Sequence, residues 1–109
     1  MSTREISTTS ESDTVAVDFD GVIHKYSKRY HDGTIYDEPI EGAFKALELL
    51  SKKFNVIIYT TRAAVPIKNW FKKHGQECPQ VYYKPRARYY IDDRAVKFTD
   101  WEDVLKKIL

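Results

Sequence analysis

The chain has 109 residues, 42% of them hydrophobic and 14% aromatic, which is enough for a single domain with a modest core. A formal net charge of +2 is too small to predict nucleic acid binding, and the single cysteine, Cys78, excludes an intramolecular disulfide and suits a reducing cytoplasm. No apolar run approaches the ~18 residues of a membrane span, and the polar amino terminus lacks the hydrophobic segment of a signal peptide.

The predicted elements alternate between strands and helices, after a polar tail at residues 1–13 that we expect to be disordered. Apolar runs predict the strands, and apolar residues at three-and-four spacing predict the helices. The chain order is strand Thr14–Phe19, helix Ile40–Lys53, strand Asn55–Tyr59, helix Pro66–His74, strand Val81–Tyr83, strand Tyr89–Ile91 and helix Asp100–Ile108. Thr99 and Glu102 have the spacing of a capping box for the last helix. This alternation predicts an α/β domain over residues 14–109 with a mostly parallel sheet.

A polar, tyrosine-bearing connection over residues 24–39 is longer than a typical loop. Asp32-Gly33 within it is a turn signal, and Thr34–Tyr36 is a candidate short strand. We interpret residues 24–39 as a flap, and we expect His24 and His31 to be exposed residues of it. Trp70, Phe71 and Trp101 are expected to be core residues.

Polar side chains that could bind a ligand or take part in catalysis follow the predicted strands. Asp18 and Asp20 come at the end of the first strand, Thr60 follows the second, and Asp92-Asp93 follow the run at Tyr89–Ile91. In parallel sheets, ligands bind beyond the carboxyl ends of the strands. Neighbouring carboxylates repel unless a cation or a substrate compensates them, which indicates a divalent-metal site, a nucleophile with an acid/base partner, or both.

These side chains suit phosphoryl transfer. Asp18 is placed to attack phosphorus and Asp20 to transfer the proton, while Asp18, Asp93 and the Asp20 carbonyl are candidate ligands of Mg²⁺. Thr60 would bind the non-bridging oxygens, and Lys84 would neutralise the phosphoryl group.

In this order, the four segments resemble the motifs of the haloacid dehalogenase superfamily of phosphohydrolases. The matching segments are Asp18-Phe19-Asp20-Gly21-Val22, Val56–Arg62, Lys84-Pro85 and Tyr90–Ala95. Val22 departs from the threonine common at that position.

The resemblance implies a Rossmann-like three-layer sandwich and an Mg²⁺-dependent phosphomonoester hydrolase acting through an aspartyl-phosphate. It implies the catalytic residues Asp18, Asp20, Thr60 and Lys84, the substrate-binding residues Gly21, Thr61 and Arg62, and the metal-binding residues Asp18, Asp20, Asp92 and Asp93. Between Asp92 and Asp93, it favours Asp93 as the direct ligand. The short intervals between motifs imply a small member without a cap domain.

The substrate is left open as a nucleotide, a sugar phosphate or a larger phosphorylated molecule. Cations near the strand ends and in the flap form either a positive rim for such ligands or scattered solubilising charge. These cations are Lys25, Lys28, Arg29, Arg62, Lys84, Arg86, Arg88 and Arg94. The alternative functions are a noncatalytic α/β module that binds phosphate or metal, and a receiver-like phosphoacceptor domain.

Overall fold

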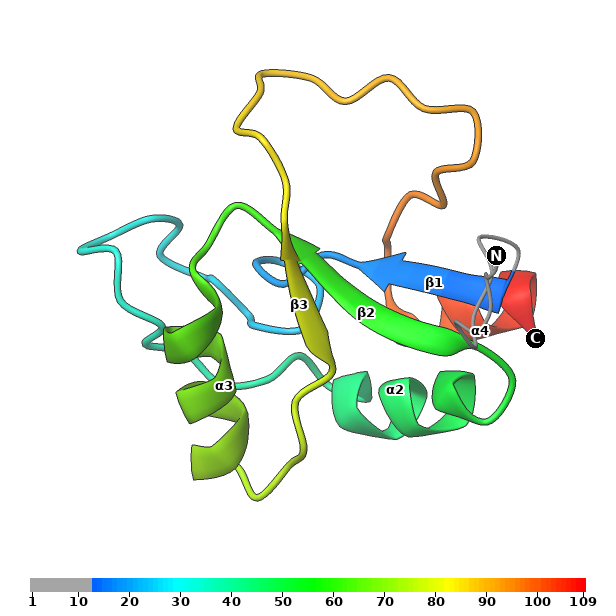
Figure 1. Cartoon of the computed structure of the whole chain (residues 1–109), viewed down its shortest axis with the longest axis horizontal. Coiled ribbons are helices and arrows are strands. Elements are labelled where there is room, and N and C mark those ends of the chain that lie inside the picture. Colours follow the sequence, from blue (N-terminus) through cyan, green and yellow to red (C-terminus); the bar gives the residue numbers. More distant parts are fainter. Residues whose placement is uncertain (1–12) are drawn as a thin grey trace, which may run out of the picture.

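A computed structural model describes residues 13–109, and the predicted tail lies outside these residues except for Asp13. Three parallel strands form one sheet in the order β1-β2-β3, with bounds Thr14–Val17, Asn55–Thr60 and Gln80–Tyr83. The helices are α2 (Ala43–Ser51), α3 (Ala64–Lys73) and α4 (Trp101–Ile108) (Figure 1). The predicted α/β class is therefore confirmed for the described part of the chain.

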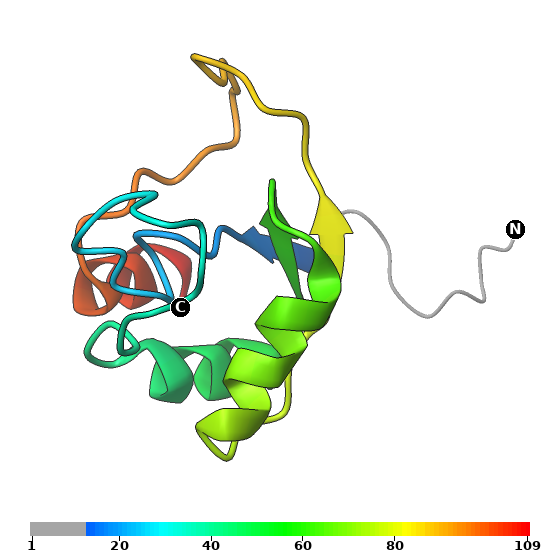
Figure 2. The same cartoon turned by 90° about the vertical axis from the view of Figure 1, so that its left-hand side faces the viewer.

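The helices gather on one side of the sheet, as Figures 1 and 2 show together. β1, β2 and β3 follow one another across the sheet in a single direction, and right-handed crossovers in one direction place α2 and α3 on the same face. α4 packs beside α2 instead of covering the opposite face. Residues 13–109 thus form two layers, one of strands and one of helices. The predicted three-layer sandwich is not confirmed for this part of the chain.

The strand register explains which side chains are covered. Val17 pairs with Ile58 and Ile58 with Val81, and this row faces the helices and the core. Alternation then places Tyr59 and Tyr82 on the other face, where they are 40% and 46% exposed. The core beneath the sheet includes Trp70, Phe71 and Trp101, as predicted, together with Phe19, Ile23, Leu50, Ile58 and Ile67.

Helix termini differ from the predicted ones for local reasons. α2 begins after Gly42, which has φ +83°, a conformation that favours glycine, so Ile40 lies in the turn before the helix. α3 begins at Ala64, and Pro66 is accommodated in its first turn, where amide hydrogens have no helical partner.

The capping box predicted for α4 is wrong in its partners. The Asp100 carboxylate caps the helix by accepting from the Asp103 N–H at 2.8 Å, and the Thr99 hydroxyl donates to the Asp103 carboxylate instead of pairing with Glu102.

The strand predicted at Tyr89–Ile91 does not form. Residues 84–99, which we call the basic loop, contain no helix or strand, and Ile91 is fully exposed. Three apolar residues between arginines and an acid pair cannot bury enough surface to offset the entropy of ordering them. Among the described strands, β1 consequently lies at the edge of the sheet, and the short strand suggested at Thr34–Tyr36 is also absent.

Candidate active site

The carboxyl ends of the three strands bring together Asp18, Thr60 and Lys84. Asp18 follows β1, Thr60 ends β2 and Lys84 follows β3. The Lys84 N–H donates to the Thr60 carbonyl at 2.8 Å, which extends the β2–β3 ladder by one bond. The Lys84 ammonium then reaches across to Asp18, with Nζ 3.3 Å from Oδ2. These three residues are far apart in the sequence, and they lie close together because parallel strands end at a common edge of the sheet, as the sequence predicted.

Asp18 keeps part of its carboxylate accessible although it is paired. Its Oδ1 accepts the Phe19 N–H at 2.7 Å, and its side chain is 43% exposed. The Lys84 side chain is only 14% exposed because its ammonium also lies over the rings of Tyr59 and Tyr90, at 5.6 and 4.8 Å from the centroids. This gives an exposed carboxylate beside a partly enclosed cation.

The Phe19–His24 turn directs the chain away from β1. The Phe19 carbonyl accepts the N–H groups of Val22, Ile23 and His24, at 3.2, 2.8 and 2.9 Å. Gly21 has φ +82°, and its N–H donates to the His24 carbonyl at 2.8 Å. The amide of Gly21 is thus already used within the turn and is not free for a substrate.

Asp20 is held on both oxygens. Arg62 Nε donates to Oδ2 at 2.7 Å, and His24 Nδ1 lies 2.9 Å from Oδ1. The side chains of Asp20 and Arg62 are 20% and 13% exposed, so this ion pair is largely shielded from water. Arg62 Nη1 also donates to the Gly33 carbonyl at 2.9 Å, which ties the flap to the end of β2.

His24 is completely buried, contrary to the expectation of an exposed flap residue; His31 is exposed as expected. The Asp37 N–H donates to Nε2 at 3.0 Å, so the ring proton of neutral His24 lies on Nδ1, where it donates to Asp20. The ring stacks on Phe19 at 5.3 Å. Sequence reasoning missed this role, although His24 directly follows the apolar pair Val22-Ile23 and lies four residues after Asp20.

Thr60 contributes a buried hydroxyl. Its residue exposure is 1%, and its Oγ1 accepts the Arg62 N–H at 3.1 Å. Within residues 13–109 the hydroxyl hydrogen has no acceptor, which leaves a donor at the strand ends. Thr61 instead lines a cavity under the flap.

The acids do not form a metal site in this structure. Within residues 13–109, no group of three or more His, Cys, Asp or Glu side chains is placed to hold a metal ion. Asp92 lines a cavity of about 670 Å³ together with Asp18 and Lys84, beside β1, whereas Asp93 does not line it. Asp92 also accepts the Arg94 N–H at 2.8 Å. The carboxylate set suits Mg²⁺ chemically, but this geometry does not fit it.

Hydrogen bonds within the flap hold its conformation, although it contains no helix or strand. Tyr36 Oη accepts the Lys28 N–H at 2.7 Å and donates to the Arg29 carbonyl at 2.8 Å. The hydroxyl and N–H of Ser27 both donate to Asp37, and with the Glu38 N–H they lower the pKa of that carboxyl to about 2.

The flap borders a cavity of about 660 Å³, which we call the flap cavity. It lies between the flap, the end of β2 and α3. Its lining residues include Asp20, Tyr26, Tyr30, Arg62, Trp70, Lys73 and Arg86. Asp20 therefore borders this cavity, while Asp18 borders the one along β1.

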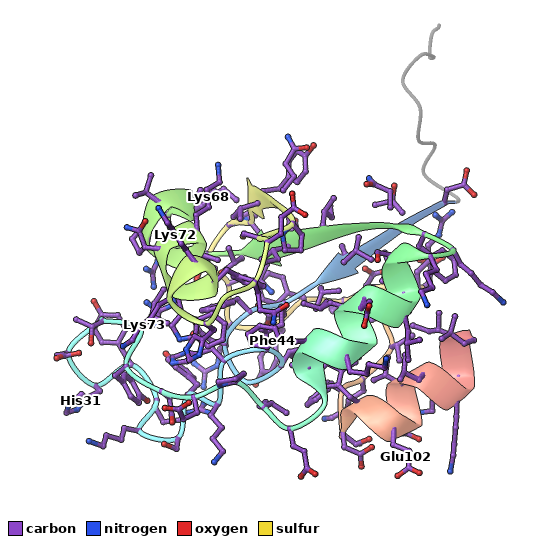
Figure 3. The ribbon with its side chains drawn as sticks, turned by 90° about the horizontal axis from the view of Figure 1, so that it is seen from below. His31, Phe44, Lys68, Lys72, Lys73 and Glu102 are labelled. Carbon is purple, nitrogen blue, oxygen red and sulfur yellow. The ribbon has the colours of Figure 1, made fainter. Side chains whose placement is uncertain are left out.

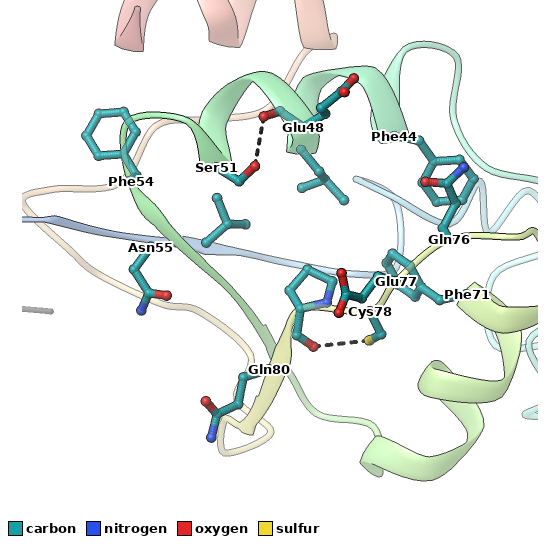
Figure 4. Close-up of a pocket in the computed structure, with 13 residues that line it drawn as sticks. Phe44, Glu48, Ser51, Phe54, Asn55, Phe71, Gln76, Glu77, Cys78 and Gln80 are labelled. Atoms are coloured by element: carbon teal, nitrogen blue, oxygen red, sulfur yellow. Dashed lines mark hydrogen bonds between the residues drawn. The ribbon is translucent and has the colours of Figure 1, made fainter. Parts of the chain in front are cut away.

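A further cavity of about 520 Å³ lies at the amino ends of β2 and β3 and contains Cys78 (Figure 4). Burial raises the pKa of the Cys78 thiol to about 11, and the thiol donates to the Pro79 carbonyl at 3.1 Å. A protonated thiol is a poor nucleophile, so this cavity is separate from the strand-end chemistry.

Comparisons with protein-family models, curated proteins and solved structures gave no match. None of the helices in residues 13–109 has the length and hydropathy needed to cross a bilayer. What the fold and site define is an α/β protein with an acid, a hydroxyl and a lysine at the carboxyl ends of a parallel sheet.

Proposed function

We propose that this chain is a phosphomonoester hydrolase of the haloacid dehalogenase type in which Asp18 attacks phosphorus. The supporting observation is the convergence of Asp18, Thr60 and Lys84, with Lys84 Nζ 3.3 Å from the Asp18 carboxylate. Lys84 holds the nucleophile and compensates the charge of an arriving phosphoryl group, and the Thr60 hydroxyl donates to one of its oxygens. Stabilising charge in this way is the main contribution a protein makes to phosphoryl transfer.

Asp20 is the proposed proton-transfer group. Its carboxylate lies on the flap-cavity side of the strand ends, where a leaving group would depart. Arg62 occupies one of its oxygens, so the productive state requires Nε to release Asp20 while Nη1 keeps its bond to the Gly33 carbonyl. His24 keeps the other oxygen in place throughout.

The cofactor proposed for this reaction is Mg²⁺, and the substrate is a phosphorylated small molecule. Because the acids do not form a metal site in this geometry, metal binding requires the basic loop to bring Asp92 or Asp93 toward Asp18.

The experiment is turnover of a generic aryl phosphate with and without Mg²⁺. Asp18→Asn is expected to abolish hydrolysis because no other carboxylate is placed to attack. Asp20→Asn should lower kcat by roughly two to four orders of magnitude through loss of proton transfer. Glu102→Gln, an exposed carboxylate on α4, is the matched control and should leave the rate unchanged. Near-normal turnover by Asp18→Asn would reject the nucleophile, and full activity in excess chelator would reject the metal.

A noncatalytic phosphate-binding module is the second candidate. It is favoured by the complete engagement of Asp20 with Arg62 and His24. Phosphate binding at Lys84 without turnover of any phosphomonoester would select this function over hydrolysis.

A further inference from the structure

The flap cavity adjoins the proposed reaction centre and has the size of a small-molecule site. Asp20, Thr61 and Arg62 line its inner end, and the flap and α3 supply the rest. Its volume of about 660 Å³ lies within the range of ligand pockets in proteins. A phosphoryl group at Asp18 would therefore direct its leaving group past Asp20 into this cavity.

The cavity carries excess positive charge. Arg62 is neutralised by Asp20, whereas Lys73 and Arg86 make no ion pair within residues 13–109. Figure 3 shows Lys73 beside the flap, while Lys68 and Lys72 of the same helix lie farther from it. Lys73 and Arg86 come from the end of α3 and from the basic loop, so the two elements place two uncompensated cations around one cavity.

The same cavity has aromatic walls. Trp70 is 5% exposed and fixed by its Nε1–H bond to the Asp37 carbonyl at 3.0 Å. Tyr26 lies under the Arg62 guanidinium at 5.8 Å, whereas Tyr30 is 60% exposed and offers a ring for stacking. An exposed aromatic face beside cations favours a ligand that joins a planar ring to an anionic group.

The flap is held in a strained conformation around these walls. Tyr26, Arg29 and His31 have φ of +59°, +59° and +52°, in the left-handed region that disfavours residues with a Cβ. Such a conformation persists only where surrounding contacts enforce it. The Arg62–Gly33 bond and the Tyr36 hydroxyl bonds are such contacts, so the cavity is preformed.

We propose that the flap cavity binds the leaving group of the substrate and that this leaving group is a nucleoside carrying a second phosphate. Lys73 and Arg86 bind the second phosphate, and the base stacks on Tyr30. The inference rests on the proposed hydrolase function for the direction of the leaving group, and it names nucleoside bisphosphates as the substrate class.

The test measures binding by calorimetry to the Asp18→Asn variant, which prevents turnover. The ligands are adenosine 3′,5′-bisphosphate, adenosine 5′-monophosphate and ribose 5-phosphate. We expect the bisphosphate to bind about tenfold more tightly than the monophosphate because two cations contact the extra phosphate. The added substitutions Lys73→Met and Arg86→Met should remove this preference.

The matched control carries Lys72→Met and Arg88→Met, which remove two neighbouring cations that do not line the cavity. It should keep the preference. Equal affinity for the two adenosine ligands, or a preference that survives loss of Lys73 and Arg86, would overturn the proposal, as would ribose 5-phosphate binding as tightly as the monophosphate. A preference that depends on both cations, without hydrolysis by the native chain, would support the cavity assignment and reject the hydrolase function.

Discussion

At the scale of single residues, Asp20 and His24 are the pair that most constrains the chemistry. The Asp37 N–H occupies Nε2 of His24, so a second proton on the ring would place two donors against each other. His24 therefore accepts a hydrogen bond at Nε2 instead of offering a proton to a leaving group, and its Nδ1 is directed at Asp20. Its part is to hold the carboxylate of Asp20, which makes it a positioning residue.

Replacing His24 by Gln is expected to lower kcat for an aryl phosphate about tenfold with little change in KM, because Asp20 loses its donor but the phosphoryl contacts remain. His24→Asn, whose amide can take the place of Nδ1–H, should recover part of the rate. Circular dichroism melting controls for folding, and an unchanged kcat in a folded His24→Gln protein would contradict the assignment.

Asp37 makes the flap sensitive to acid. Its pKa is lowered to about 2, chiefly by the Ser27 hydroxyl, from an ordinary value of 3.8. A lowered folded-state pKa means that the carboxylate stabilises the flap above about pH 4 and that this stabilisation is lost as the pH falls toward 2.

Hydrogen exchange of the flap amides at pH 5 and at pH 2 measures this loss after correction for intrinsic rates. Ser27→Ala should reduce flap protection at pH 5 and have a much smaller effect at pH 2. An equal effect at both pH values would show that the Asp37 charge does not anchor the flap.

At the scale of elements, the basic loop and β1 line the same cavity. The cavity of about 670 Å³ runs along Thr14–Asp18 on one side and Arg94–Val96 on the other. Ile91 and Tyr89 are 100% and 76% exposed just beyond it. The loop thus carries apolar residues that the rest of the described chain does not cover.

We expect millimolar Mg²⁺ to increase hydrogen-exchange protection over residues 88–94, because a cation shared by Asp18 and the Asp92-Asp93 pair would draw the loop toward β1. The measurement is independent of turnover. Asp18→Asn should abolish the increase, whereas Glu102→Gln should preserve it. Protection that does not change in Mg²⁺ would exclude a metal site that includes this loop.

At the scale of the whole molecule, stability depends on one core between the sheet and its single helical layer. Ile58 occupies the central strand and has no exposed surface. Deleting buried side-chain carbons removes transfer free energy and leaves a cavity.

Ile58→Ala is therefore expected to lower the free energy of unfolding by about 2–5 kcal/mol in urea denaturation. Ile91→Ala makes the same chemical change at a fully exposed position and should stay within about 0.5 kcal/mol of the parent chain. A comparable loss in both variants would mean that Ile91 packs against the molecule in solution.

The sequence alone determined the α/β alternation, the core residues Trp70, Phe71 and Trp101, and the three strand-end side chains Asp18, Thr60 and Lys84. These follow from local information: apolar runs mark strands, helical spacing marks helices, and parallel strands end at a common edge. Phosphoryl chemistry, the metal and the substrate stay predictions, because residue types at strand ends indicate a reaction without demonstrating it.

Only the tertiary structure decided how the site is arranged. Arg62 meets Asp20 across 42 positions of sequence, and His24 is buried through a bond from Asp37. Residues 89–91 stay outside the sheet, and α4 packs beside α2, so the layers number two in the described chain. The periodicity of apolar residues indicates whether a segment favours helix or strand. Whether the segment pairs or becomes buried depends on contacts with distant parts of the chain, which must offset the entropy lost when the segment is ordered.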